Sequence, residues 1–144
     1  MRKRIYLSVP LVVNRDIETA KEIARIIKTT GHEIISDWVL ERDPNGGLAE
    51  AEVFKRDTEG VRGCDTIIAE VSTPSHGVGM ELMLAHLLGK EIICVYRAGT
   101  KLSWMIRGLP NAILIEYKNM RDLKEKLQKV FKKRGRGSRV GERS

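Results

Sequence analysis

The feature that most constrains the fold is an alternation of short apolar runs with amphipathic stretches along the whole chain. The apolar runs have the length and β-branched content of buried strands. Strands that alternate with helices are typical of parallel sheets, so the pattern predicts one doubly wound α/β domain. The predicted strands span Ile5–Val9, Glu33–Ser36, Thr66–Val71, Glu91–Tyr96 and Ala112–Tyr117.

Four helices are predicted between and after these strands. Residues 20–27 repeat their apolar side chains at helical spacing, and Gly31 provides a stop. A more polar helix is expected from about 48 to 61, and a closing amphipathic helix from about 120 to 131. The helix expected from Met80 to Leu88 is apolar nearly all round, so we expect it to be buried.

The positive charge of the chain is concentrated at one end. Of the net charge of +7, residues 132–144 contribute +5 and the rest +2. That basic segment has no apolar periodicity, so we expect a catalytic domain over residues 1–131 and a disordered tail over 132–144. A solubilising tail is favoured over a nucleic-acid-binding one, although the positive charges also allow contacts with nucleic-acid phosphates.

Composition excludes several other classes of protein. No apolar run approaches the roughly 20 residues of a membrane helix, so no membrane partner is expected. Cys64 and Cys94 offer neither a disulfide framework nor zinc-site spacing, which favours a reducing cytoplasm. The three histidines have no metal-ligand spacing either. We expect neither a metal nor a cofactor.

The residues after the third strand are the first candidates for chemistry, because parallel α/β sheets bind ligands beyond the carboxyl ends of their strands. Ser72 to Gly79 form a loop whose hydroxyls and glycine amides suit an anionic group at a helix start, although a plain tight turn gives the same pattern. Glu81 is expected in the first helical turn, where the helix dipole favours an ionised, nucleophilic carboxylate. A structural acid at the helix start is the alternative.

Glycoside chemistry needs a second carboxylate to protonate the leaving group. Asp57 and Asp65 are the candidates. Asp65 begins the third strand at its amino end, on the wrong side of the sheet, which favours a structural role. Asp57 lies on the preceding predicted helix, whose orientation the sequence leaves open.

Residues 64–82, with the motif Ser75-His76-Gly77-Val78-Gly79-Met80-Glu81-Leu82, closely resemble 2′-deoxynucleoside 5′-monophosphate N-hydrolases, relatives of the nucleoside 2-deoxyribosyltransferases. The resemblance continues through residues 89–97 and 102–108. It implies a Rossmann-like sheet of five parallel strands and a homodimer. It also implies Glu81 as the nucleophile and selects Asp57 as the second catalytic acid.

The resemblance further implies a substrate-binding set. Tyr6 would lie near the sugar, Ser75 would bind phosphate, and Ser103 would reach the phosphate from the neighbouring subunit. Three parts of the chain depart from the family, namely the loop Ser8–Asn14, where a glycine- and arginine-containing loop is usual, the surroundings of Asp37 and Trp38, where a histidine near the base is usual, and the positions of His76 and Met80. The full predicted set is Tyr6, Val9, Leu11, Trp38, Ser75, Gly77, Gly79, Ser103 and Met105.

The implied activity is hydrolysis of the N-glycosidic bond of deoxynucleotides through a covalent glycosyl–Glu81 intermediate. Two alternatives stay open at this point. One is a nucleoside 2-deoxyribosyltransferase, in which a second base intercepts the intermediate. The other is a noncatalytic nucleotide-binding protein.

Overall fold

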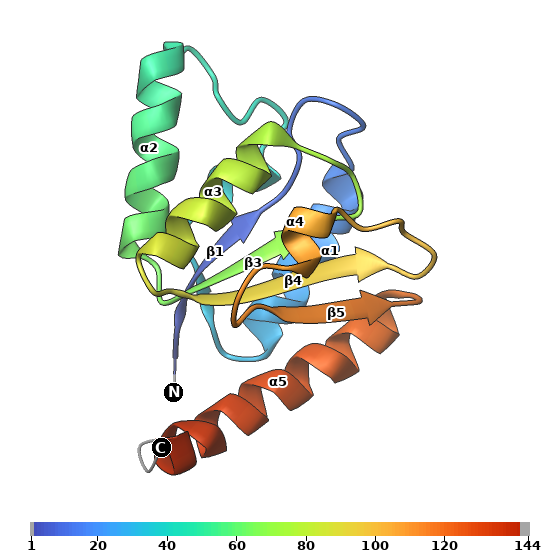
Figure 1. The fold of residues 1–144 in the computed structure, drawn as a ribbon. Helices are drawn as coiled ribbons and strands as arrows, with labels where there is room; N and C mark the ends of the chain where they lie inside the picture. Colours follow the sequence, from blue (N-terminus) through green and yellow to red (C-terminus); the bar gives the residue numbers. More distant parts are fainter. Residues whose placement is uncertain (1, 142–144) are drawn as a thin grey trace.

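A five-stranded parallel sheet forms the centre of the molecule, in the order β2-β1-β3-β4-β5 (Figure 1). The structure, a computed structural model, describes residues 2–141. Its strands are β1 (Arg4–Ser8), β2 (Glu33–Ile34), β3 (Thr66–Glu70), β4 (Glu91–Arg97) and β5 (Ile113–Tyr117). The predicted fold class is confirmed.

Strand β2 is shorter than predicted because the side chain of Ser36 takes the place of backbone hydrogen bonds between β2 and β1. The hydroxyl of Ser36 accepts a hydrogen bond from the amide of Leu7 at 2.8 Å and donates one to the carbonyl of Leu7 at 2.9 Å. Both polar groups of that β1 residue are therefore satisfied without a strand partner at Ser36. The chain turns there into the short 3₁₀ helix η1 (Asp37–Leu40).

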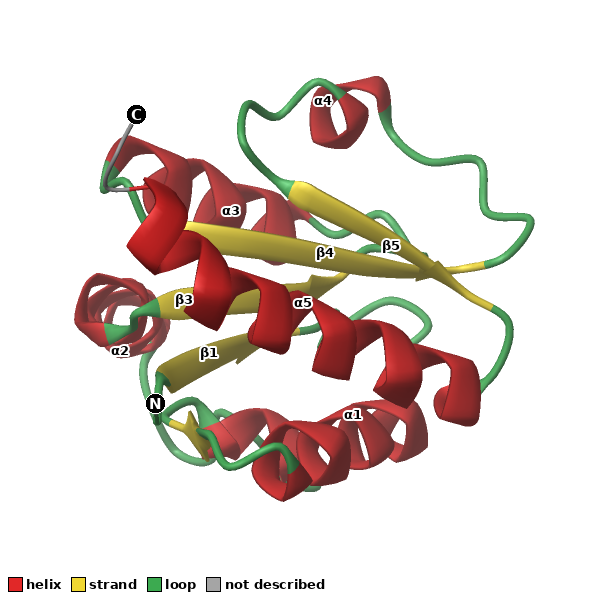
Figure 2. Cartoon of the chain, turned by 90° about the horizontal axis from the view of Figure 1, so that it is seen from below, coloured by secondary structure: helices red, strands yellow, loops and turns green. Residues whose placement is uncertain are grey.

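Helices cover both faces of the sheet. The helices are α1 (Ile17–Thr29), α2 (Glu50–Gly63), α3 (His76–Leu87), α4 (Trp104–Arg107) and α5 (Met120–Gly141). Helices α1 and α5 pack on one face, and α2 and α3 pack on the other (Figures 1 and 2). The sequence pattern gave no signal for η1 or for the four-residue helix α4.

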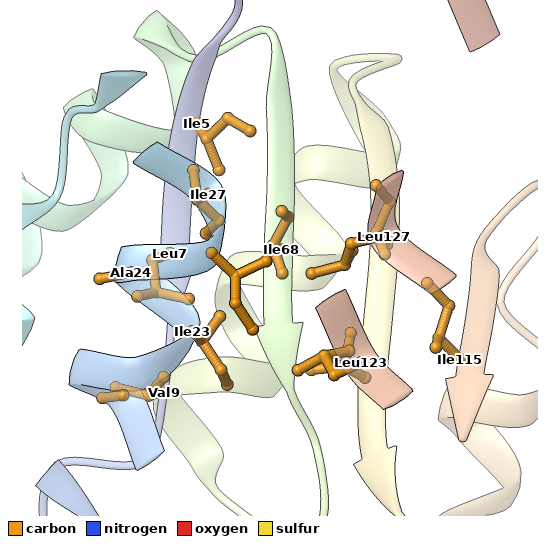
Figure 3. Packing of buried hydrophobic residues seen from close by; sticks show 14 of the residues in the cluster. Ile5, Leu7, Val9, Ile23, Ala24, Ile27, Ile68, Ile115, Leu123 and Leu127 are labelled. Atoms are coloured by element: carbon orange, nitrogen blue, oxygen red, sulfur yellow. The ribbon is translucent and has the colours of Figure 1, made fainter. Parts of the chain in front are cut away.

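Two apolar cores result from the alternation of side chains along β1. Ile5 and Leu7 point toward α1 and α5, where they join Ile23, Ile27 and Leu123 (Figure 3). Tyr6 points the opposite way, into the core under α2 and α3. Since alternate residues of a strand face opposite sides, Ser8 lies on the same face as Tyr6.

The prediction that the helix after β3 is buried was wrong. Val78, Leu82 and Ala85 of α3 face the sheet and are buried, whereas Met80 and Leu87 are 58% and 70% exposed. A helix that is apolar all round gives no indication of which side will be buried. Only one side of α3 packs against the sheet. Despite that apolar character, no helix within residues 2–141 is long and apolar enough to cross a membrane.

Helix α5 is longer than predicted. It continues to Gly141, whereas the apolar periodicity ended at Phe131 and disorder was expected from residue 132. Lysine and arginine are good helix formers, whereas Gly135, Gly137 and Gly141 disfavour a helix, so residue propensity alone does not explain the continuation. The remainder of the predicted tail, residues 142–144, lies outside the described residues, and the boundary between a domain and a tail stays a prediction.

Close packing of α2 on β1 depends on Gly60. A Cβ atom at this position would lie 2.7 Å from Cε2 of Tyr6 and 3.3 Å from Cη2 of Trp38. The ring of Tyr6 is buried and cannot move away freely. The missing side chain therefore lets α2 approach the tyrosine ring closely.

We expect Gly60→Ala to lower the free energy of unfolding by about 1–3 kcal/mol, because the added methyl overpacks a buried aromatic contact. Gly63→Ala in the same helix is the matched control, since a Cβ there meets nothing within 4 Å. Alanine favours helix over glycine, so the control should be neutral or slightly stabilising. Chemical denaturation measures both, and equal effects would contradict the close-approach explanation.

Candidate active site

The carboxylate of Glu81 is held by two hydroxyl groups from β1. The hydroxyl of Tyr6 donates to Oε2 and that of Ser8 donates to Oε1, each at 2.6 Å. Glu81 can receive both because it lies three residues after Val78 and four before Ala85, on the side of α3 that faces the sheet. Tyr6 and Ser8 are two residues apart on one strand face, so their hydroxyls reach the same group.

Burial dominates the electrostatics of Glu81. Desolvation raises the pKa of this carboxyl from 4.5 to about 7; the hydrogen bonds from Ser8 and Tyr6 oppose the rise, and the charge of Asp57 adds to it. Burial, followed by the charge of Glu81, raises the pKa of Tyr6 far above its ordinary value, so this hydroxyl keeps its proton.

The expected position of Glu81 in the first turn needs correction. Helix α3 begins at His76 with Ser75 as its N-cap, so Glu81 lies in the second turn. The dipole effect is concentrated in the first turn, and the ionised state is therefore favoured less than the sequence implied. The hydroxyls of Tyr6 and Ser8, rather than the helix dipole, favour the ionised form of Glu81.

Asp57 lies on α2 and lines the same cavity as Glu81, which resolves the open orientation of this helix. Its Oδ1 accepts a hydrogen bond from Nε of Arg56 at 2.9 Å. Arg56 also donates to the carbonyl of Pro44 and to Oδ1 of Asn45, and its guanidinium lies 4.4 Å from the ring centroid of Trp38. Arg56 thus fixes Asp57 together with the loop before α2.

Asp65 lies elsewhere, as predicted. Its Oδ2 accepts a hydrogen bond from the amide of Arg4 at 2.7 Å, at the start of β1 and β3. Glu81 is bonded to Tyr6 and Ser8, toward the other end of β1. Of the two candidate acids, only Asp57 shares a cavity with Glu81.

A cavity of about 470 Å³ opens beside Glu81 at the carboxyl ends of β1 and β3. It brings together six of the predicted site residues, from three separate segments of the chain, in a volume suited to a small-molecule ligand. Most of the other lining residues are apolar, and Pro10, Val12 and Val13 among them come from the loop after β1. The six residues are Val9, Leu11, Asp57, Ser75, Gly77 and Glu81.

A second groove, of about 380 Å³, adjoins this cavity between α2 and α3. It shares Asp57, Gly77 and Glu81 with the first. Phe54 and Met80 contribute apolar surface to it. The acid pair therefore lies where the two spaces meet.

Five predicted residues do not line the cavity, namely Tyr6, Trp38, Gly79, Ser103 and Met105. Trp38 packs edge-on against Tyr6, with ring centroids 6.0 Å apart, and supports the site from behind. Ser103 and Met105 lie at the start of α4, and both are exposed. Within one chain they are not brought to Glu81.

The start of α3 presents polar groups to the cavity. The Oγ of Ser75 accepts a hydrogen bond from the amide of Val78 at 3.3 Å and caps the helix. The amide of Gly79, the last of the predicted binding positions, bonds to the carbonyl of Ser75 inside the helix. Ser75, His76 and Gly77 are the residues of this segment that reach the cavity wall before Val78.

A buried carboxylate, Glu70, holds the loop that leads to α3. It accepts hydrogen bonds from the amide and hydroxyl of Ser72, at 2.6 and 2.9 Å, and from the hydroxyl of Tyr117. The hydroxyl of Ser72 in turn accepts from the amide of Arg97 at 2.8 Å. This network joins the carboxyl ends of β3, β4 and β5.

Sequence reasoning missed Ser8 and Arg56. The sequence could have indicated Ser8, because it follows the predicted site residue Tyr6 by two positions on the same strand and so lies on the same face. Nothing in the sequence indicated Arg56, since its contacts with Asp57, Pro44 and Trp38 depend on how the loop folds back. Among the described residues, no group of three or more His, Cys, Asp or Glu could hold a metal ion.

The parallel sheet, with a cavity at the carboxyl ends of its strands, has the arrangement in which open α/β proteins bind small-molecule ligands. The sequence model for nucleoside 2-deoxyribosyltransferases matches residues 5–129. The chain belongs to this family, and the resemblance stated from its motifs is confirmed at that level.

Individual relatives cover nearly the whole chain. A protein of Thermofilum pendens named "Putative 2′-deoxynucleoside 5′-phosphate N-hydrolase 1" is 30% identical over 135 residues, 89% of this chain and 94% of its own. The 5-hydroxymethyl-dUMP N-hydrolase of Esox lucius is 33% identical over 129 residues, 85% and 86% of the two chains. The structure of the Clostridium botulinum CMP N-glycosidase BcmB has the same fold, with a TM-score of 0.66, 24% identity, and coverage of 87% of this chain and 97% of that one.

We expect Glu81→Gln to stabilise the protein above about pH 7 and to have little effect near pH 4.5. Between these values the folded chain retains a proton on Glu81 that the unfolded chain has lost, so stability falls as pH rises. Removing the charge should recover up to roughly 3 kcal/mol of unfolding free energy. Glutamine keeps the size of the side chain and can still bond to both hydroxyls.

Thermal unfolding from pH 4.5 to 8.5 measures this difference. Glu59→Gln, at an exposed glutamate of α2, controls for loss of one negative charge. A constant difference between Glu81→Gln and the parent across the range would contradict a buried, protonatable Glu81.

Proposed function

We propose that this chain hydrolyses the N-glycosidic bond of 2′-deoxynucleoside 5′-monophosphates to a free base and 2-deoxyribose 5-phosphate. The observation that carries the proposal is the carboxylate of Glu81, held by Tyr6 and Ser8 and sharing a cavity with Asp57. Family membership and the names of the full-length relatives support the same reaction.

The proposed reaction has two displacements at the anomeric carbon. In the first, an oxygen of ionised Glu81 bonds to C1′ while the bond from C1′ to the base breaks and Asp57 supplies a proton to the base. In the second, water attacks C1′, the glycosyl ester to Glu81 breaks, and Asp57 receives the water's proton. Each oxygen of Glu81 has a second lone pair beyond the one its hydroxyl donor uses, so attack does not require either hydrogen bond to break.

The hydroxyls of Tyr6 and Ser8 have a defined part in this proposal. They fix the rotamer of Glu81, so that the carboxylate is oriented before the substrate arrives. They also lower a pKa that burial alone would raise further, which keeps a useful fraction of the nucleophile ionised near neutral pH. Tyr6 donates a hydrogen bond to the nucleophile from β1, whereas Val9 and Leu11 form the cavity wall on which the sugar would lie.

We expect purified protein to release free base from a panel of deoxynucleoside 5′-monophosphates, and Glu81→Ala to lose more than about 10³-fold of this activity. Asp57→Asn should reduce base release by about 10²–10⁴-fold. Chromatography of base and sugar phosphate measures both. Release at the parent rate by folded Glu81→Ala would refute the proposed nucleophile.

An acceptor base added to the same reaction separates hydrolysis from transfer. A hydrolase should give free base and sugar phosphate at an unchanged ratio, whereas a deoxyribosyltransferase would give a new nucleotide. Binding of monophosphates without any base release would instead support a noncatalytic nucleotide-binding protein.

The same proposal includes a homodimer in which Ser103 acts across the interface. Ser103 and Met105 are exposed and away from the cavity of their own chain, and Trp104 between them is 88% exposed. Met80 and Leu87 add exposed apolar surface on α3. Large exposed apolar side chains on α3 and α4 support a surface that a second copy of the chain covers.

Mixing two inactive forms tests the shared site. Glu81→Ala and Ser103→Ala chains, unfolded together and refolded, should recover more activity than the sum of the two refolded separately. In the mixed dimer one site combines an intact Glu81 with an intact Ser103. No gain, with both forms folded and dimeric, would place the whole site within one chain.

A further inference from the structure

The cavity beside Glu81 has an unusual balance of charge for a site that takes a phosphorylated substrate. Among the described residues that line it, Asp57 and Glu81 are acidic, and no lysine or arginine contributes to the wall. His76 is the one basic side chain in that lining. A phosphate dianion entering this space meets repulsion from the acids and needs a donor that offsets it.

His76 is placed and free to be that donor. It is the first residue of α3, directly after Ser75, so both side chains leave the chain at the same edge of the cavity. Its imidazole is exposed and makes no hydrogen bond or ion pair with any residue in the described part of the chain. One ring nitrogen carries a proton in either charge state, so the ring can donate a hydrogen bond to phosphate.

The other cations nearby are committed or lie in a different space. Arg56 is taken up by Asp57, Asn45 and the carbonyl of Pro44. Arg62 lines only the second groove, between α2 and α3. Neither shares the edge of the cavity formed by Ser75 and His76.

We propose that His76, in addition to the serines already assigned to the phosphate, makes this site prefer 5′-phosphorylated substrates over nucleosides, by binding the phosphate with its imidazole beside Ser75. The inference rests on the proposed glycosidase function and adds a specificity-determining residue to it. The acids then act on the sugar and the base, while the phosphate lies against the start of α3.

The test compares kcat/KM for deoxynucleoside 5′-monophosphates with that for the matching deoxynucleosides in the parent, His76→Leu, His76→Lys and Arg62→Leu. We expect His76→Leu to lower kcat/KM for the monophosphates by about tenfold or more and to leave nucleosides unchanged, since a charge-assisted hydrogen bond is lost. His76→Lys restores a donor and should keep the preference. Arg62→Leu, which removes a cation from the neighbouring groove, should keep it as well.

Binding measurements separate this inference from the proposed function. In the Glu81→Gln background, calorimetry with a monophosphate and with its nucleoside should show that His76→Leu weakens only the monophosphate. If the parent releases no base yet His76→Leu weakens monophosphate binding, the glycosidase proposal fails and the phosphate site stands. If the parent releases base and His76→Leu leaves the substrate preference unchanged, or Arg62→Leu abolishes it, the role of His76 is refuted.

Discussion

The half-buried carboxylate of Glu81 is the constraint on which the other features of the site depend. A carboxylate removed from water costs several kcal/mol unless donors replace its hydration. Two hydroxyls at 2.6 Å do so only partly, because its pKa still rises to about 7. The hydroxyl donors and the carboxylate must therefore meet with little tolerance, and their separation is set by how α3 packs on β3 and β4, next to β1 in the sheet. The buried Val78, Leu82 and Ala85 fix that distance.

Two tyrosine–glutamate pairs occur at the carboxyl edge of the sheet, and their surroundings distinguish their roles. Glu70 accepts hydrogen bonds from the hydroxyl of Tyr117 and from the amide and hydroxyl of Ser72, and it is 7% exposed. All of its bonds stabilise the loop between β3 and α3, so it belongs to the scaffold. Glu81 accepts hydrogen bonds from the hydroxyls of Tyr6 and Ser8, but it also lines a cavity of about 470 Å³. A carboxylate that is oriented by the protein and still reachable by a ligand is suited to nucleophilic attack.

The sequence predicted what depends on local periodicity and failed where only tertiary contacts decide. The five strands and four of the helices follow from spacing, because each buries a regular face. The buried side of α3 did not follow, since its residues are apolar in every direction. The orientation of Asp57 also required the structure, because Gly60 sets how α2 approaches Tyr6. Arg56 gained its role from a loop twelve residues earlier in the chain. Motif resemblance supplied the pairing of Glu81 with Asp57, which spacing alone left open.

In the proposed dimer, assembly and chemistry would be linked through the second groove. The groove shares Asp57 and Glu81 with the main cavity, and its apolar wall of Phe54 and Met80 continues onto exposed surface of α2 and α3. A subunit that covers this surface, as in the proposed dimer, would close the groove and remove water from one side of the acid pair. Loss of water strengthens the interaction of both acids with a substrate, and it raises the pKa of Glu81 further. The hydroxyls of Tyr6 and Ser8 then become more important, because they are the donors that keep this carboxylate ionised once solvent is excluded.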